Sequence, residues 1–368
     1  MKNQLKHLLI LVSLGIMLIC GQCFAGEKGV ANFFWWTDMQ YREKITVKTF
    51  FKGPKSAKNY AKLGERLANE YNAKNIDYGI FTGDMIWEAD NNKGVYPWAT
   101  WGWPNAEYIF KCIDYKRPSI KSGKRDIPYG VLAGNHDVLS DPLDVESYSD
   151  FEKSFKPYTS RFGKDKFKNK SCYREDFLNN VGHCDVVEAG GQNFVIIYMS
   201  YGINKMTDAK TKSVSGKECP VNEASKEWMN HVLDKYKNMK AILCFHDAKD
   251  TSSNSYSYYK DVVEKNDNVF MVLGGHYLAR ITSKKSDGNR VMAADGGHSE
   301  KTVHFRKSDG TSRKVHILFH NYQEMENYGD CGYYRRIQLD LNKNSMKLWS
   351  ENVVNKNVID RVEINNVF

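Results

Sequence analysis

Short apolar runs recur along the chain, and most of them end in polar side chains that can bind a metal ion. The runs are "NFFWWT" (32–37), "DYGIFTG" (77–83), "IPYGVLAG" (127–134), "NFVIIYMS" (193–200), "AILCFHD" (241–247) and "NVFMVLGGH" (268–276). Their lengths and their aromatic and β-branched content predict buried strands. Helical periodicity between the runs gives two apolar faces, formed by Tyr60, Leu63, Leu67 and Tyr71 and by Trp228, Val232, Leu233 and Tyr236. Strands alternating with helices predict a layered α/β fold, and the strand-only pattern after about residue 290 predicts a second sheet.

The polar residues at the strand ends are the strongest functional signal. They are Asp38, Gln40, Asp84, Asn135, His136, His246 and His276. Ligands of α/β proteins gather at the carboxyl ends of strands, so these side chains are expected to converge. Oxygen donors mixed with imidazoles suit Mn²⁺, Fe²⁺ or Zn²⁺. One such residue alone is often a helix cap or a turn residue, but a series of them in one chain indicates a metal site.

The order and spacing of these residues resemble the calcineurin-like metallophosphoesterase superfamily. Its D-x-H, G-D, G-N-H-D/E, H and G-H-x-H motifs correspond to "TDMQ" (37–40), "TGD" (82–84), "GNHD" (134–137), "FHD" (245–247) and "GGHYL" (274–278). The resemblance implies a four-layer αββα sandwich of two mixed β-sheets flanked by helices. It also implies a metallophosphoesterase domain over residues 26–368 that hydrolyses a small-molecule phosphate ester with a hydroxide activated by metal ions.

The same resemblance implies a site for two divalent ions, Mn²⁺, Fe²⁺ or Zn²⁺. Asp84 would bridge both ions, because the ligand between two cations must be an anion. Asp38 and Gln40 would bind the first ion, and Asn135, His246 and His276 would bind the second. His136 would face the phosphate as the catalytic acid. Two ions in such a site clamp a phosphate and activate water.

The chain departs from the family pattern around the first ion. Gln40 and Leu278 replace the two histidines that the family places there, which predicts a weak first site. His298 and His320 are candidates to supply a missing ligand. Either Glu88 or Asp137 is a candidate to orient His136, because Trp87 occupies the place where the family often has a carboxylate.

A tryptophan-rich segment between the second and third motifs is expected to overhang the site. Its members are Trp87, Trp98, Trp101 and Trp103. Trp87 and Trp101 would stack on a base or sugar ring of the substrate, or the rings would form a small core of their own. Arg280 would contact phosphate or form a surface salt bridge. An alternative function is a metallophosphoesterase-like binding protein with an incomplete metal site, in which the tryptophan-rich segment recognises a glycan or a lipid headgroup.

The first 25 residues have the pattern of a secretory signal peptide. Lys2 and Lys6 precede the apolar run 8–20, and Ala25 stands at the expected cleavage position. We therefore expect an exported protein, periplasmic or extracellular, with no membrane span after cleavage. Removal of this segment takes away two lysines and no acid, so the net charge falls from +9 to +7. The remaining lysines are scattered among acids, which argues against a nucleic-acid groove.

Six cysteines remain after this cleavage. An exported chain permits disulfides, and Cys172, Cys184 and Cys219 lie in loop-like sequence where bridging is plausible. Cys244 lies in an apolar run, so it is expected to be a buried thiol. The pairing of the other cysteines stays open at the level of sequence.

Overall fold

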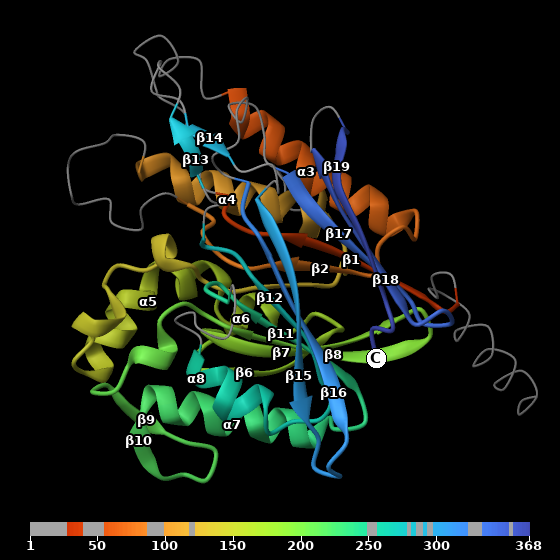
Figure 1. Cartoon of the computed structure of the whole chain (residues 1–368). Helices are drawn as coiled ribbons and strands as arrows, with labels where there is room; N and C mark the ends of the chain where they lie inside the picture. The colour runs from red at the N-terminus through yellow and green to blue at the C-terminus, as the bar shows by residue number, and fades with distance from the viewer. Residues whose placement is uncertain are drawn as a thin grey trace, which may run out of the picture.

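Two mixed β-sheets pack face to face, and helices cover the outer face of each (Figure 1). The computed structural model describes residues 28–39, 55–86, 99–117, 122–248, 256–277, 281–284, 290–292, 297–322, 333–352 and 356–368. The architecture confirms the predicted four-layer αββα sandwich. Within the described residues, no helix is long and apolar enough to cross a bilayer.

The first sheet has six strands in the order β19-β18-β17-β1-β2-β5. Its parallel strands are β1 (Val30–Trp36), β2 (Tyr78–Phe81) and β5 (Tyr129–Val131). Its antiparallel strands are β17 (Tyr333–Asp340), β18 (Ser345–Asn352) and β19 (Val358–Asn365). Helices α3 (Lys55–Asn72) and α4 (Ala99–Asp114) lie on its outer face (Figure 1).

The second sheet has seven strands in the order β15-β16-β12-β11-β8-β7-β6. Its parallel strands are β8 (Gln192–Met199), β11 (Lys240–Phe245), β12 (Val269–Gly274) and β16 (Ser312–His320). The antiparallel edges are β6 (Tyr173–Phe177), β7 (Gly182–Ala189) and β15 (His298–Arg306). On its outer face lies α7 (Val221–Lys235), whereas α5 (Tyr148–Phe162) and α6 (Lys164–Phe167) lie at the side of the two sheets and also contact β5.

The described residues also form several short strands and helical turns. The small strands are β3 (Tyr115–Arg117), β4 (Ser122–Lys124), β9 (Lys210–Lys212), β10 (Glu218–Pro220), β13 (Ile281–Lys284) and β14 (Arg290–Met292). The short helical turns are η3 (Asn135–Asp137), η4 (Pro142–Asp144), η5 (Ile203–Lys205), α8 (Tyr256–Tyr258) and η6 (Tyr259–Val263).

Alternation of side chains along β1 explains why its sheet has two apolar faces. Phe33 and Trp35 point into the core between the sheets, whereas Phe34 and Trp36 pack in the core beneath the helices. Successive side chains of a strand face opposite sides, so a strand buried on both sides reads as a continuous apolar run. This burial fixes the register that brings the strand ends, and the residues after them, to one edge.

The six predicted strands are present, but the interpretation of the C-terminal third was wrong in one respect. Its strands do not form a separate second sheet. β15 and β16 extend the seven-stranded sheet, while β17 pairs with β1 and carries β18 and β19 into the six-stranded sheet. The pairing of β17 with β1 joins residues about 300 positions apart, and no local pattern reports such a partner.

The cysteines and the two helical faces can now be placed. Cys172, Cys184 and Cys219, where bridging was considered plausible, are free thiols in the structure, as is the buried Cys244. Leu67 on α3 is buried, and so are Trp228, Val232 and Leu233 on α7. These two helices therefore contribute their apolar faces to the core as their periodicity predicts.

Candidate metal centre

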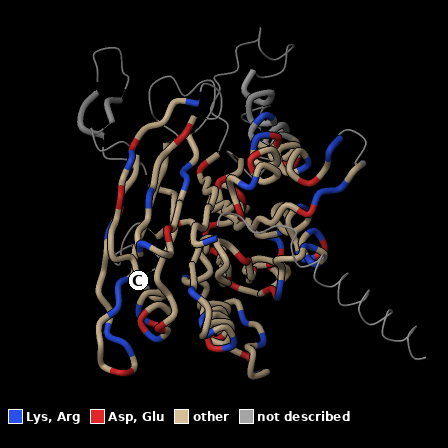
Figure 2. Tube along the Cα trace, turned by 90° about the vertical axis from the view of Figure 1, so that its right-hand side faces the viewer, with Lys and Arg blue, Asp and Glu red and all other residues tan. Residues whose placement is uncertain are grey.

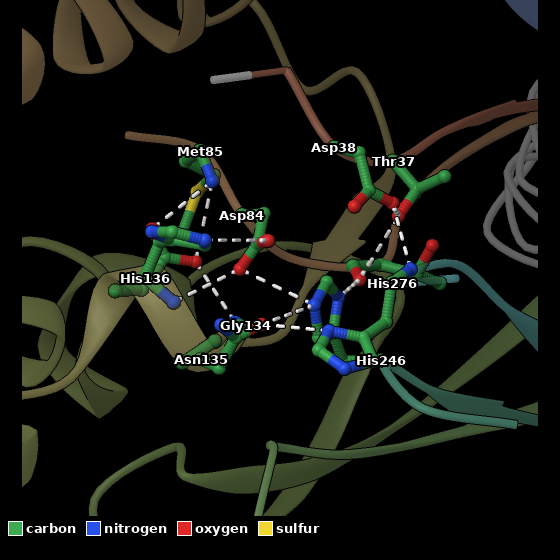
Figure 3. A network of polar contacts seen from close by, with 12 residues as sticks. Thr37, Asp38, Asp84, Met85, Gly134, Asn135, His136, His246 and His276 are labelled. Atoms are coloured by element: carbon green, nitrogen blue, oxygen red, sulfur yellow. Dashed lines mark hydrogen bonds and ion pairs between the residues drawn. The ribbon is translucent and has the colours of Figure 1, made fainter. Parts of the chain in front are cut away.

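Four of the predicted ligands meet at the edge where parallel strands of both sheets end (Figure 3). Asp84 follows β2, Asn135 follows β5, His246 follows β11 and His276 follows β12. Because the strands run in parallel, their carboxyl ends lie at one edge and direct these side chains toward a common point.

The donor atoms of Asp84, His246 and His276 lie within 4.8 Å of one another. His246 Nε2 is 3.2 Å from Asp84 Oδ1 and 3.0 Å from Asn135 Oδ1. His276 Nδ1 is 2.8 Å from the same Asn135 oxygen. One carboxylate, two imidazoles and one amide oxygen thus converge in a space the size of a coordination sphere.

A contact with the main chain fixes the orientation of the His246 ring. Its Nδ1 lies 2.7 Å from the carbonyl oxygen of Thr82, to which it donates when protonated. This contact directs Nε2 toward Asp84, and the ring is fully buried. A hydrogen bond on one ring nitrogen that orients the other is the usual arrangement of histidines that bind metals.

The backbone around the centre is strained and closely packed. Asp38, Asp84 and His276 have φ values of 52°, 53° and 68°, in the left-handed region that side chains other than glycine rarely adopt. A Cβ atom on Gly134 would overlap Asp84 Oδ1, and a Cβ on Gly275 would overlap Asp38 Oδ2. Strain of this kind persists only where the surroundings enforce it, and it concentrates at functional sites.

Asp38 lies beside this cluster and is held by a residue that the sequence did not reveal. Its Oδ2 accepts hydrogen bonds from the Thr37 hydroxyl at 2.7 Å and from the His276 backbone N–H at 3.0 Å. Its Oδ1 accepts one from Asn321 Nδ2 at 2.9 Å. Asn321 also donates to the His276 carbonyl at 3.3 Å, so it connects the two residues. Asn321 follows β16 directly, but its contact with Asp38 depends on β16 lying beside β12, which the local sequence does not report.

His136 borders the cluster from its more open side. Its backbone N–H donates to Asp84 Oδ1 at 3.0 Å, and its Nε2 lies 3.9 Å from Asp84 Oδ2. The side chain is 29% exposed, whereas that of Asp84 is 2% exposed. His136 therefore adjoins the central carboxylate and still reaches solvent, as a group that transfers protons to a substrate must.

Asp137 organises the backbone around His136. Its carboxylate accepts hydrogen bonds from the N–H groups of Gly134 at 2.8 Å, Met85 at 3.0 Å and Ile86 at 3.3 Å. These bonds tie the turn after β5 to the turn after β2. Asp137 thus sets the position of His136 through the main chain, in a different way from the direct orientation we considered.

Burial and charge shift the pKa values of these groups strongly. Burial would raise the pKa of Asp84, but the charge of His246 holds it below its ordinary range. Burial disfavours the charged form of His246, yet Asp84 outweighs it and raises the pKa of His246 to about 10. Burial and then the charge of His246 lower the pKa of His276 to about 4. Burial raises the pKa of Asp38 to about 7.

The donor set fits a divalent first-row ion. Asp84, His246 and His276 supply one carboxylate and two imidazoles, and the Asn135 oxygen adds a fourth donor. Mixed nitrogen and oxygen ligands of this kind suit Mn²⁺, Fe²⁺ or Zn²⁺. The close approach of three glycines, Gly83, Gly134 and Gly275, keeps the space around the donors free of Cβ atoms.

Several predicted site residues are not among the donors described above. Gln40, Trp87, Glu88, Leu278 and Arg280 lie outside the described residues. Trp101 lies on the described backbone of α4, but its side chain is not described. Trp103 is buried near Phe162, with the Arg161 guanidinium 4.8 Å from its ring centroid, and belongs to the main hydrophobic core instead of a small core of its own.

The two histidines considered as replacement ligands contact other residues, away from the candidate metal centre. His298 lies 3.0 Å from Glu300 and 3.6 Å from Asp360 in a separate charged cluster. His320 packs edge-on against Trp35 with 4.3 Å between ring centroids. Neither is in the group of converging donors. Tyr201, which the sequence did not indicate, does reach the centre, and its ring lies 5.9 Å from that of His246.

Comparisons with known proteins identify the family of the chain. The calcineurin-like phosphoesterase family matches residues 37–280. The uncharacterized protein YvnB of Bacillus subtilis is 30% identical over 318 residues, which cover 85% of this chain but only 19% of that protein. The chain therefore corresponds to a minor part of the length of this relative.

Solved structures with a similar arrangement are distant in sequence. A dimetal phosphatase from Danio rerio is 11% identical with a TM-score of 0.45, covering 91% of this chain and 99% of its own. GAP50 of Plasmodium is 10% identical with a TM-score of 0.45, covering 91% and 89%. A 5'-nucleotidase from Candida albicans is 13% identical with a TM-score of 0.40, covering 93% and 53%.

Proposed function

Because the chain belongs to the calcineurin-like phosphoesterase family, we propose that it is a metal-dependent hydrolase of a small phosphate ester. The observation that carries the proposal is the convergence of Asp84, His246 and His276 within 4.8 Å. Divalent ions bound there would supply an activated water and neutralise the charge of the phosphate.

Different sets of residues of the chain, which share Asp84, would bind the two ions. Asp84, Asn135, His246 and His276 would hold one ion, and Asp84 would extend toward a second ion beside Asp38. The carboxylate of Asp84 is suited to this place because it is the buried anion at the centre of the cluster. The two ions would be Mn²⁺, Fe²⁺ or Zn²⁺.

His136 would donate the proton that the leaving oxygen requires. Its ring adjoins Asp84 and is partly exposed, so a substrate at the mouth of the site can contact it. Its backbone is fixed by the bond from its own N–H to Asp84 and by the bonds that Asp137 makes to Gly134 and Met85. A general acid held in this way loses little entropy when it transfers its proton.

We also propose that the protein is exported and that residues 1–25 are its signal peptide. The support for this proposal is the sequence pattern of that segment, which lies outside the described residues. Residues 26–368 would then form the metallophosphoesterase domain.

The test is a screen of phosphate esters in the presence of Mn²⁺ with the wild type and with Asp84→Asn. A neutral amide cannot hold two cations, so turnover is expected to fall by about a thousandfold or more, several kcal/mol of transition-state stabilisation. The bound metal, measured by elemental analysis, should fall with it. Asp150→Asn is the matched control, because the Asp150 side chain is 41% exposed and contacts Ser147 and Lys153 at the start of α5.

The same experiment decides between an enzyme and a binding protein. About two ions per chain together with turnover support the hydrolase. A single bound ion, no turnover with any ester, and retained binding of a glycan or lipid headgroup would establish the alternative. Undiminished turnover in Asp84→Asn would refute the bridging role of this residue.

A further inference from the structure

A pocket of about 500 Å³ lies at the edge of the seven-stranded sheet opposite to the metal centre. Its lining includes the first residues of four parallel strands: Gln192, Lys240, Val269 and Ser312. The metal centre follows the other ends of these strands. Since a strand rises about 3.3 Å per residue, the six residues of β11 place the two sites roughly 20 Å apart.

The lining of this pocket is strongly cationic. Its cationic side chains are Lys237, Lys240, Lys307, Arg313 and Lys314. Among the described residues that line it, Asp267 has the only acidic side chain. Asp267 already accepts hydrogen bonds from the N–H and the hydroxyl of Ser308, which order the turn between β15 and β16. In Figure 2, lysine and arginine positions lie along the strands beside the C-terminus.

Two of the lysines, Lys240 and Lys307, form no ion pair with the described residues, although the charge of Asp309 acts on Lys307. In the part of the chain that the structure describes, neither Lys240 nor Lys307 has a carboxylate within the 4.0 Å of an ion pair. Lys240 is half-buried and lies 3.5 Å from the ring centroid of Phe368. Burial lowers the pKa of Lys240, and the like charge of Lys307 lowers it further. An anion placed between these two ammonium groups would relieve both effects.

Arg313 gives the pocket a fixed wall, and its charge is partly balanced by Asp267, whose Oδ1 lies 3.8 Å from Arg313 Nε. Its Nη1 donates to the carbonyl oxygen of Val269 at 2.7 Å, and its Nη2 donates to that of Val263. The residue is 7% exposed, so its guanidinium cannot move away from the lysines into solvent. Phe270 and Phe368 form an apolar wall, with 5.1 Å between their ring centroids.

We propose that this pocket is a second ligand site, which binds a phosphate group carried on an apolar or aromatic group. The phosphate would lie between Lys240 and Lys307, and the apolar group would lie against Phe270 and Phe368. The volume is in the range of small-molecule sites and exceeds the space that a free phosphate ion needs. The phosphate could belong to a soluble compound or to a lipid headgroup, and the experiment separates these two sources.

The test uses phenylphosphonate, which no phosphoesterase can hydrolyse, titrated calorimetrically into the intact protein. Wild type is expected to show one saturable site more than Lys240→Met. Lys307→Met should weaken binding at that extra site by about tenfold, because each lysine forms a charge-assisted hydrogen bond. Lys153→Met is the control for the loss of one positive charge, since Lys153 is exposed on α5 and pairs with Asp150.

A parallel arm measures sedimentation with vesicles that contain phosphatidylglycerol. Vesicle binding that Lys240→Met abolishes, without an extra phenylphosphonate site, assigns the pocket to a lipid headgroup. Binding of phenylphosphonate alone assigns it to a soluble ligand. The proposal is overturned if neither probe binds outside the metal centre, or if Lys240→Met binds both probes as wild type does. Turnover of a phosphate ester should be equal in all three variants, because the pocket is remote from the metal centre.

Discussion

At the scale of single residues, Gly134 shows how closely the metal centre is packed. A Cβ atom there would lie 2.8 Å from Asp84 Cγ and would overlap its Oδ1. Asp84 is 1% exposed, so its close packing leaves no space into which the carboxylate could move. Gly134 is therefore required by the close approach of two turns, and not by its backbone angle, since its φ is −88°.

We expect Gly134→Ala to displace the Asp84 carboxylate and to lower kcat/KM for a phosphate ester by about a hundredfold, as a displacement of roughly 1 Å in a catalytic group does. Bound metal, measured by elemental analysis, should fall as well. Gly216→Ala is the control for an added methyl group away from the centre: a Cβ there meets nothing within 4 Å, and its φ of 82° adds only local backbone strain. Equal metal content and activity in the two variants would show that the centre tolerates the added methyl group.

The candidate ligands could be predicted from the sequence where each stands directly after an apolar run. Asp84, Asn135, His246 and His276 have this property, and the structure brings them together. Asn321 follows a strand in the same way, but an asparagine at a strand end is usually only a turn residue. Its contact with Asp38 depends on which strands are neighbours, and that information is not local.

At the scale of elements, a buried charged cluster joins the two sheets. Glu300 on β15 pairs with Arg335 on β17, and His298 on β15 lies 3.6 Å from Asp360 on β19. Arg335 is fully buried, and its Nη1 also donates to Ser350 Oγ at 2.9 Å. The cluster therefore links an edge strand of the seven-stranded sheet to the antiparallel part of the six-stranded sheet.

We expect Glu300→Gln to lower the free energy of unfolding by about 3 kcal/mol, because it leaves the buried charge of Arg335 without its partner. Urea unfolding followed by circular dichroism measures the change. Glu223→Gln is the matched control: Glu223 is exposed and pairs with Lys226 at 3.1 Å, and such surface pairs contribute about 1 kcal/mol or less. Equal losses in both variants would mean that the cluster does not hold the sheets together.

At the scale of the whole molecule, the order of the strands could not be predicted although their positions could. The apolar runs located β1, β2, β5, β8, β11 and β12, because a strand buried on both faces has a local signature. The sequence of the C-terminal strands does not indicate which strands they pair with. β17 pairs with β1, which lies at the opposite end of the chain. The layered α/β class followed from local patterns and the four-layer sandwich from the family resemblance, whereas the division of the last strands between two sheets depends on the packing of the complete chain.

Proton and metal binding should be coupled across the centre, because His246 has a pKa of about 10 beside Asp84. In the chelated protein this residue is then protonated below pH 10, and a metal at Nε2 must displace that proton. Affinity for Mn²⁺ should therefore rise by about tenfold per pH unit from pH 7 to 9. His276, with a pKa of about 4, is already neutral there and adds nothing to the slope.

Below pH 7 the slope should become steeper, because Asp38 has a pKa of about 7 and must also lose its proton when an ion binds. Calorimetric titration of Mn²⁺ at pH 6, 7, 8 and 9, in two buffers with different heats of ionisation, measures both the affinity and the number of protons released. In Asp84→Asn the carboxylate that raises the pKa of His246 is absent, so the pH dependence between 7 and 9 should largely disappear. An affinity in the wild type that does not change from pH 6 to 9 would show that His246 Nε2 does not bind the ion.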